Sequence, residues 1–432
     1  MGALTERAAG LLAAHRWAAG PTLVSTVASG TAAATTLVIA RGVGAAAFGH
    51  FTVVLSIALI VTVGMLMSLN SVMFQELPRA ESAARSARLK AELLKTELVT
   101  TALLCTLVLG AVVFAAGMLA APLLTGALGV DTRTLAFALA LALSMTLNQL
   151  TESFLRGLKR FRLVAGLKLA VAVAYLGGAA FFLLVLGLRD AEPYLVALIG
   201  TNLVFALVSF AGFEVAPRTW SRALARSIYR HGAYVTVIGA LTAVVFGVDV
   251  IFLNHWAPRA DVGVYSVYNG FPKRLLGVVF TDGVGLVLLP TLATSDKPAV
   301  MRRIARLAPA VFTATAVFAF AASTVFFLLV GGEYPYSLGL MALSAIGIGA
   351  HTVFNLQQVA LTMDGVRGAR VLIGCLLAGT PLALACQAAL IAWQGLVGGL
   401  VAFALSNLVL VAVVTAVSTR LYRPAGASEV RG

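Results

Sequence analysis

The chain has 432 residues, of which 60% are hydrophobic and only 11% are charged, and its formal net charge is +14. Its mean hydropathy of +0.98 excludes a soluble globular domain, because such a domain cannot remove that much apolar surface from water. The composition therefore places the chain in a membrane.

Apolar runs of about twenty residues recur twelve times along the chain. Each is long enough to cross a hydrocarbon core of about 30 Å at about 1.5 Å per residue. The predicted spans, in chain order, are 21–40, 50–69, 97–119, 134–153, 165–188, 194–213, 233–254, 262–292, 308–331, 336–362, 371–393 and 396–418. The connections between them are short, so the sequence leaves no room for a catalytic domain outside the membrane.

The basic residues predict how the spans are oriented. If the N-terminus is cytoplasmic, 24 Lys and Arg residues fall on inner segments, against four on outer ones, Arg41, Arg133, Arg189 and Arg259. This asymmetry is the positive-inside pattern, and it predicts that both termini are cytoplasmic. Basic segments beside anionic lipid headgroups also account for the net charge, so no nucleic-acid partner is expected.

Two pairs of segments indicate an internal repeat. Residues 41–51, Arg-Gly-Val-Gly-Ala-Ala-Ala-Phe-Gly-His-Phe, follow the first span, and residues 256–265, which end in Val-Gly-Val-Tyr, follow the seventh about 214 positions later. Residues 148–162 and 355–370 form a second pair, about 208 positions apart. Two pairs at nearly the same period predict two homologous halves, an arrangement with which many transporters build a central cavity.

The predicted fold is an all-α integral membrane bundle of about twelve helices in two pseudo-symmetric lobes of six. Residues 1–20 contain no uninterrupted apolar core of a signal peptide, because Glu6, His15 and Arg16 interrupt it. The predicted units are an amphipathic N-terminal segment, a first lobe, a cytoplasmic linker, a second lobe and a cytoplasmic tail. Their bounds are 1–20, 21–213, 214–232, 233–418 and 419–432.

Several segments resemble one protein family. Residues 41–51 resemble the Arg-x-Leu-Gly-x-x-x-Phe/Tyr-Gly-x-Phe/Tyr signature of bacterial polysaccharide-biosynthesis flippases, the Wzx-type members of the multidrug/oligosaccharidyl-lipid/polysaccharide (MOP) exporter superfamily. In the second half, the Asp and apolar run at 248–253, the Gly-Val-Tyr-Ser at 263–266 and the Leu-Pro-Thr-Leu at 289–292 are similar to family segments. Together the likeness covers nearly the whole chain.

The resemblance implies both a structure and an activity. It implies a cavity between the lobes, lined chiefly by the first, second, seventh and eighth helices. The expected activity is movement of an undecaprenyl-pyrophosphate-linked oligosaccharide from the inner to the outer leaflet of a bacterial plasma membrane. The expected partners are this anionic glycan, membrane lipids and polysaccharide polymerase or glycosyltransferase machinery. No cofactor is expected, and an ion gradient would drive transport because the sequence has no nucleotide-binding motif.

Two adjacent cations lie inside the eighth span. Lys273 and Arg274 come about eleven residues into it, where a basic side chain facing lipid costs roughly 2.5–3.5 kcal/mol. Counted in fours, Tyr265 and Asn269 share the helix face of Lys273. Pro272 lacks a backbone N–H and crowds the preceding turn, which predicts a kink. We expect a bent helix whose polar face lines a wet cavity.

Two roles remain open for this pair of cations. Lys273 and Arg274 can attract the pyrophosphate of the substrate, since an ammonium and a forked guanidinium both bind phosphate oxygens. Alternatively they form internal ion pairs, with Asp282 about two turns from Arg274 or with Asp249 on the preceding helix. Asp249 and Asp282 are also candidates for exchanging a proton or binding sodium to drive transport.

Arg41 completes the set of substrate-binding candidates, which also contains Tyr265, Asn269, Lys273 and Arg274. It lies at the outer end of the first span, where it meets an anionic substrate on exit or extends its charged group to the interface. His351, inside the tenth span, is expected to be a hydrogen-bonded packing residue, with titration near neutral pH as the alternative.

Two rival classes have weaker support in the sequence. A membrane enzyme acting on lipid-linked sugars would need an Asp-x-Asp, His-Glu-x-x-His or phosphate-binding loop, and none of these motifs occurs. A drug or cation exporter of the same superfamily, coupled to H⁺ or Na⁺, would have the same twelve spans. Adjacent cations at mid-membrane favour an anionic substrate instead.

Overall fold

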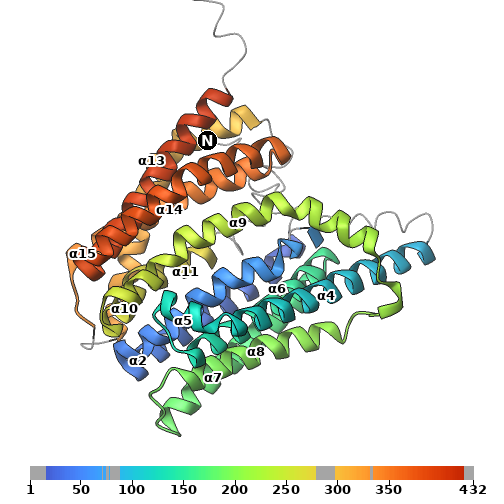
Figure 1. Cartoon of the computed structure of the whole chain (residues 1–432), viewed down its shortest axis with the longest axis horizontal. Coiled ribbons are helices and arrows are strands. Elements are labelled where there is room, and N and C mark those ends of the chain that lie inside the picture. The colour runs from blue at the N-terminus through green and yellow to red at the C-terminus, as the bar shows by residue number, and fades with distance from the viewer. Residues whose placement is uncertain are drawn as a thin grey trace, which may run out of the picture.

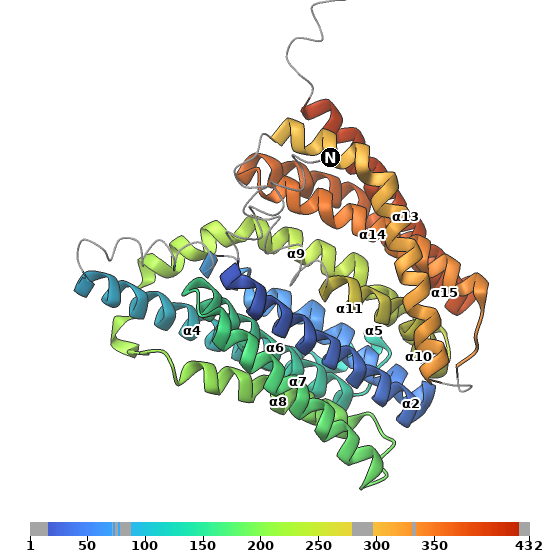
Figure 2. The ribbon, with the colours of Figure 1, turned by 180° about the vertical axis from the view of Figure 1, so that it is seen from behind.

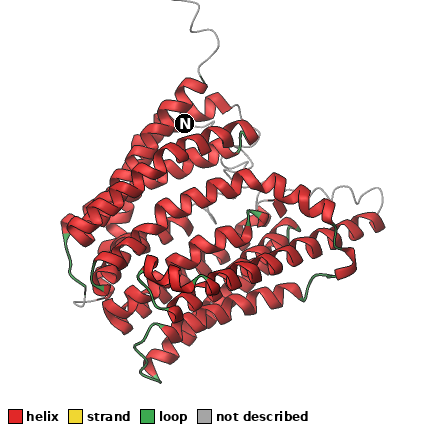
Figure 3. Ribbon diagram, viewed as in Figure 1, coloured by secondary structure: helices red, strands yellow, loops and turns green. Residues whose placement is uncertain are grey.

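The computed structural model describes residues 16–70, 72–73, 77, 88–278, 297–330 and 334–422. This part of the chain is almost entirely helical and contains no strand (Figure 1, Figure 3). The helices of the first half are α2 (Arg16–Leu66), α4 (Arg88–Leu119), α5 (Ala121–Leu128), α6 (Thr132–Gly157), α7 (Phe161–Leu184) and α8 (Glu192–Phe210). Those of the second half are η1 (Pro217–Thr219), α9 (Arg222–Trp256), α10 (Arg259–Tyr265), η2 (Ser266–Gly270), α11 (Phe271–Val278), α13 (Lys297–Val330), α14 (Leu338–Thr362) and α15 (Gly365–Leu421).

Two of these helices each contain two predicted spans. The backbone of α2 leaves helical geometry at Gly44, with φ 79° and ψ 169°, and that of α15 at Gly395, with φ 54° and ψ −125°. Glycine adopts such positive φ values without the steric cost that a Cβ imposes, so both breaks fall where the sequence allows them.

The described helices account for the predicted membrane spans. Nine of them are long and apolar enough to cross a membrane. Because α2 and α15 each supply two crossings, and because α10, η2 and α11 begin the predicted eighth span, the twelve-span prediction is confirmed. Large apolar side chains such as Leu119, Leu184 and Trp393 are exposed on the outside of the bundle, as expected of surfaces that face lipid.

The helices form two pseudo-symmetric lobes. In the first, α2 packs against α6 and α7, which both contact α8; in the second, α14 packs against α13 and α15. Helix α9 runs between the two groups and contacts both α15 and α2 (Figure 1). The lobes are therefore not separate bodies, because α9 and α10 of the second half lie directly on α2 of the first.

The two lobes meet at one end of the bundle and separate toward the other. We call the meeting point the closed end; it contains the break at Gly44, the turn between α9 and α10, and the connection before α14. Toward the opposite end, α13, α14 and α15 diverge from the helices of the first half in both views (Figure 1, Figure 2). One apolar core spans both lobes near the closed end and joins Phe51 and Val54 to Leu253 and Val264.

Two helices extend beyond the predicted membrane spans. Helix α9 begins at Arg222, so its first turns lie within the predicted linker 214–232. Helix α2 begins by Arg16, inside the predicted N-terminal segment. Residues 1–15 and 423–432 lie outside the described residues, so the amphipathic segment and the tail stay predictions.

Candidate functional site

The two lobes touch through glycines of the repeated segments. Gly49, near the middle of α2, lies against the carbonyl oxygen of Arg259 on α10, and Gly263 on α10 lies against the carbonyl oxygen of Ala45 on α2. A methyl group added at either glycine would overlap the facing backbone oxygen. Gly49 thus contacts the residue four positions before Gly263, and Gly263 contacts the residue four positions before Gly49. The two repeats pack on one another by a pseudo-two-fold relation, and only glycine permits this approach.

Side chains add further contacts between the lobes at the closed end. Arg41 donates from Nη1 to the carbonyl oxygen of Leu329 at the end of α13, over 3.2 Å. Tyr334 donates from its hydroxyl to the carbonyl oxygen of Ala40, over 2.9 Å. Arg41 therefore joins the two halves at the closed end.

A turn between α5 and α6 also meets the second lobe here. Asn254 of α9 donates from Nδ2 to the carbonyl oxygen of Gly129, over 2.9 Å. Asp131 caps α6 by accepting from the Thr134 amide at 2.7 Å. Hydrogen bonds from the hydroxyl and amide of Thr134 hold the pKa of Asp131 below its ordinary value. His50 in turn lies 3.0 Å from the Thr134 hydroxyl, so the turn is tied to α2.

Pro272 disturbs the eighth span as predicted, and the structure shows the form of the disturbance. The turn before it, η2, is π-helical. Since Pro272 has no N–H to donate, the carbonyl of Tyr268 accepts instead from the Ser344 hydroxyl of α14, at 2.5 Å. The Tyr268 hydroxyl donates to the carbonyl of Pro335 at 2.6 Å. The widened turn is therefore bonded to α14 and to the connection that precedes it.

A buried polar group, which we call the Asp249 cluster, is built on this turn and comprises Asp249, Tyr265, Asn269 and Lys273. Asp249 of α9 is 1% exposed and accepts from the Tyr265 hydroxyl and, at 3.4 Å, from Nδ2 of Asn269. Asn269 also donates to the Tyr265 hydroxyl at 2.6 Å. The Lys273 ammonium lies 3.9 Å from the Asp249 carboxylate. One carboxylate thus gathers all three residues of the predicted polar face.

Lys273 also contacts α15 of its own lobe. Its Nζ lies 3.7 Å from the centroid of the Phe403 ring on α15, a cation–π contact, and its side chain is 19% exposed. Phe403 approaches because Gly347 on α14 has no side chain; a Cβ there would lie 2.5 Å from the ring. In this conformation Lys273 has the internal pairing that the sequence left as one of two alternatives, with Asp249 as the partner.

His351 lies next to this cluster. Its Nδ1 is 3.1 Å from the Asn407 side-chain oxygen, and its ring centroid is 4.5 Å from that of Phe246 in an edge-on arrangement. The prediction of a hydrogen-bonded packing histidine is confirmed. The ring also lies 6.0 Å from that of Phe403, so it supports the residue on which Lys273 rests.

Two predicted site residues cannot be placed. Asp282 and the side chain of Arg274 lie outside the described residues, so pairing between them stays a prediction. Among the residues that the structure describes, no group of three or more His, Cys, Asp or Glu side chains is arranged to hold a metal ion.

The first lobe contains an ionic group that was not predicted from the sequence. Glu152 on α6 contacts Arg156, one turn later, at 2.5 Å and Lys168 on α7 at 2.8 Å. The signal was present, because Glu152 and Lys168 both fall inside predicted apolar spans, where an ionisable residue indicates a partner. The group joins α6 to α7 and lies in the opposite lobe from the Asp249 cluster.

Comparison with known proteins agrees with this architecture. A family model described as polysaccharide biosynthesis protein matches residues 20–295. No curated protein matches the sequence. The inward-facing conformation of a multidrug resistance MATE family transporter of the MOP superfamily superposes with a TM-score of 0.64, at 14% identity, over 92% of this chain and 94% of that one.

Two further solved structures have the same fold. The outward-facing conformation of a multidrug resistance MATE family transporter gives a TM-score of 0.53 at 14% identity, over 93% of this chain and 94% of that one. A MOP superfamily transporter from Pyrococcus furiosus, whose binding pocket of reverse polarity suggests a different function, gives 0.55 at 14% identity, with coverage of 93% and 94%. At these identities the likeness shows the fold alone.

Proposed function

Because the chain belongs to the polysaccharide biosynthesis protein family, we propose that it moves an anionic, undecaprenyl-pyrophosphate-linked oligosaccharide from the inner to the outer leaflet of a bacterial plasma membrane. The chain is a multi-pass membrane transporter with the MOP fold. The observation that supports a lipid-linked oligosaccharide as the substrate is the family match, which covers the first lobe and extends past Lys273. In this role the protein catalyses no covalent reaction, and polymerase or glycosyltransferase machinery would supply and use its substrate.

The direction of transport follows from the proposed orientation. With both termini cytoplasmic, the closed end of the bundle faces outward, since Arg41 and Arg259 are among its few cations. The lobes then separate toward the cytoplasm, where the lipid-linked substrate is made. Transport requires the glycine contact at the closed end to part while the lobes meet at the other end.

The Asp249 cluster suggests how an ion gradient drives this change. Asp249 holds Lys273 through charge, so a proton or sodium ion on the carboxylate weakens that attraction and frees the ammonium for a phosphate. The side-chain oxygen of Asn269 supports this role, because it is buried and accepts no hydrogen bond from the described residues.

A drug or cation exporter is the alternative. The Pyrococcus furiosus protein indicates that pocket polarity varies on this fold, so fold alone does not choose between the two. Purified protein in liposomes separates them: a fluorescent lipid-linked glycan should reach the opposite leaflet, whereas a cationic dye should not be transported. Dye transport without glycan movement would reject the proposal.

Orientation is tested by cysteine labelling. In a variant whose three native cysteines are replaced by serine, a cysteine at Ala260 should react with an impermeant thiol reagent in intact cells, because the proposed orientation puts the start of α10 at the outer surface and Ala260 is exposed. Cysteines at Ala83 and Ala427 should be protected until the membrane is permeabilised. Reaction of Ala83 from outside would reverse the proposed topology.

Neutralising the adjacent cations tests the phosphate role. The Lys273→Gln and Arg274→Gln double variant should lose export of glycan in a complementation assay by at least tenfold, when export is divided by the amount of variant protein in the membrane. Lys273→Arg should be milder than Lys273→Glu, because it keeps the positive charge. Full complementation by the double variant would exclude a phosphate role for both residues.

A further inference from the structure

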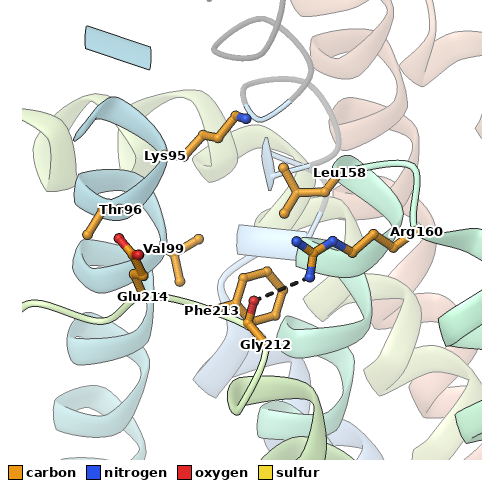
Figure 4. Close-up of a pocket in the computed structure, with 8 residues that line it drawn as sticks. All are labelled: Lys95, Thr96, Val99, Leu158, Arg160, Gly212, Phe213 and Glu214. Carbon is orange, nitrogen blue, oxygen red and sulfur yellow. Dashed lines mark hydrogen bonds between the residues drawn. The ribbon is translucent and has the colours of Figure 1, made fainter. Parts of the chain in front are cut away.

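A pocket of about 290 Å³ lies in the first lobe (Figure 4), and none of the residues that line it belongs to the closed end or to the Asp249 cluster. Its walls come from α4, from the connection between α6 and α7, and from the chain that follows α8. The residues that line it include Lys95, Val99, Leu158, Arg160, Phe213 and Glu214. These three segments are far apart in the sequence, so the pocket is a product of the tertiary structure.

Arg160 is held at the rim of this pocket. Its backbone amide donates to the carbonyl of Leu155 at 2.9 Å, which completes the turn after α6. Its Nη1 donates to the carbonyl of Gly212 at 3.3 Å, and its guanidinium carbon lies 5.9 Å from the centre of the Phe213 ring (Figure 4). A guanidinium has five N–H donors, so most remain for a ligand.

The opposite wall is also anchored. The amide of Ala216 donates to the Thr100 hydroxyl at 3.1 Å, and the amide of Ser221 donates to the Thr101 hydroxyl at 3.2 Å. Both bonds tie the chain after α8 to α4, beside Val99. The pocket is therefore formed before any ligand arrives, which lowers the cost of ordering it on binding.

The position of the pocket indicates the kind of ligand. The apolar part of α4 begins at Leu93, α6 ends at Gly157 and α8 ends at Phe210, so the pocket lies where three spans leave the hydrocarbon. Lipid headgroups occupy this level.

The lining has the chemistry of a lipid headgroup site. Val99, Leu158 and Phe213 give it an apolar floor, while Lys95 and Arg160 give it two cations. Ammonium and guanidinium groups are the side chains that bind phosphate oxygens. Glu214 is the one acidic residue among those that line the pocket, and its charge opposes an anion.

We propose that this pocket binds a phosphate group at the membrane surface, as the headgroup of an anionic phospholipid or as a free phosphate, with Lys95 and Arg160 as its cationic ligands. The site is separate from the proposed transport path, since none of its residues belongs to the Asp249 cluster. It does not depend on the identity of the transported glycan.

Lipid retention by the full-length protein tests the proposal. Protein in detergent is mixed with phosphatidylglycerol or phosphatidylcholine, and bound lipid is counted by native mass spectrometry. The wild type should prefer phosphatidylglycerol, and Lys95→Gln and Arg160→Gln should each reduce its binding about fivefold. Glu214→Gln should increase binding by a similar factor. Arg218→Gln, in η1 but outside the pocket lining, is the matched control and should bind like the wild type.

The opposite signs expected for the two kinds of variant separate binding from misfolding. A variant that merely unfolds cannot bind more lipid, so a gain with Glu214→Gln supports the pocket independently of the two cation variants. A second arm adds inorganic phosphate to protein that carries phosphatidylglycerol: displacement of the lipid assigns the site to the phosphate group itself, and its absence assigns the site to the lipid headgroup. Equal binding of the two lipids by the wild type, or equal binding of phosphatidylglycerol by all variants, would overturn the proposal.

Discussion

Replacing Gly263 by alanine is expected to push the two lobes apart at the closed end and to reduce transport at least tenfold. The new methyl group would overlap the carbonyl oxygen of Ala45. Because the overlapping atoms belong to the backbone, no flexible side chain can move aside to relieve the overlap. Overpacking of this kind costs about 1–3 kcal/mol, and about 1.4 kcal/mol changes an equilibrium tenfold. Gly49→Ala should act in the same direction, because its methyl group would meet the carbonyl of Arg259.

The separation of the lobes is measured directly with spin labels at Thr132 and Tyr336, two exposed positions near the closed end in opposite halves. The distance between them should lengthen in Gly263→Ala. Gly64→Ala, on the same helix as Gly49, and Gly270→Ala, in the same span as Gly263, are matched controls, since a Cβ at either meets nothing within 4 Å. An unchanged distance distribution together with normal transport would show that the glycine contact is not a gate.

Removing the cation beside Asp249 is expected to destabilise the protein more than removing both charges. In Lys273→Met, the carboxylate of Asp249, which is 1% exposed, keeps its hydrogen bonds but loses its positively charged partner. Breaking one side of such a pair costs about 3 kcal/mol or more. Adding Asp249→Asn removes the unpaired charge, so the double variant should regain at least half of the lost stability. The coupling is read from unfolding midpoints of all four proteins in detergent.

The control for this cycle is the other intramembrane lysine. Lys168→Met should lower the free energy of unfolding by less, because Glu152 keeps Arg156 as a partner at 2.5 Å. Its effect on that free energy should add to the effect of Asp249→Asn, since the two sites are not in contact. Transport adds a second reading: if Asp249 carries the coupling ion, Asp249→Asn should fold but lose its dependence on the ion gradient. A coupling energy near zero between Asp249 and Lys273 would mean that their proximity contributes nothing to stability.

Part of the candidate site could be read from spacing along one helix. Tyr265, Asn269 and Lys273 recur every four residues, and helical geometry alone brings such residues to one face. The choice of acidic partner could not be made in this way. The sequence offered Asp282 on the same span and Asp249 on the preceding helix, and the distance from Lys273 to Asp249 across a helix interface leaves no mark on hydropathy or charge pattern.

The broader fold was determined largely by the sequence. Composition excluded a soluble protein, apolar runs predicted twelve crossings, and the repeated segments predicted two halves, because solvent preference and helix length are properties of short stretches. Even the breaks in α2 and α15 fall between predicted spans, at Gly44 and Gly395.

What only the tertiary structure decided was which of these stretches touch. Gly49 and Gly263 are recognisable as repeats about 214 positions apart, yet nothing in the sequence states that they pack against each other and close one end of the bundle. Nor does the sequence predict the pairing of Lys273 with Asp249 or the pocket between α4, α6 and α8. Such contacts depend on how whole helices settle against one another, and that packing sums many weak interactions between residues far apart in the chain.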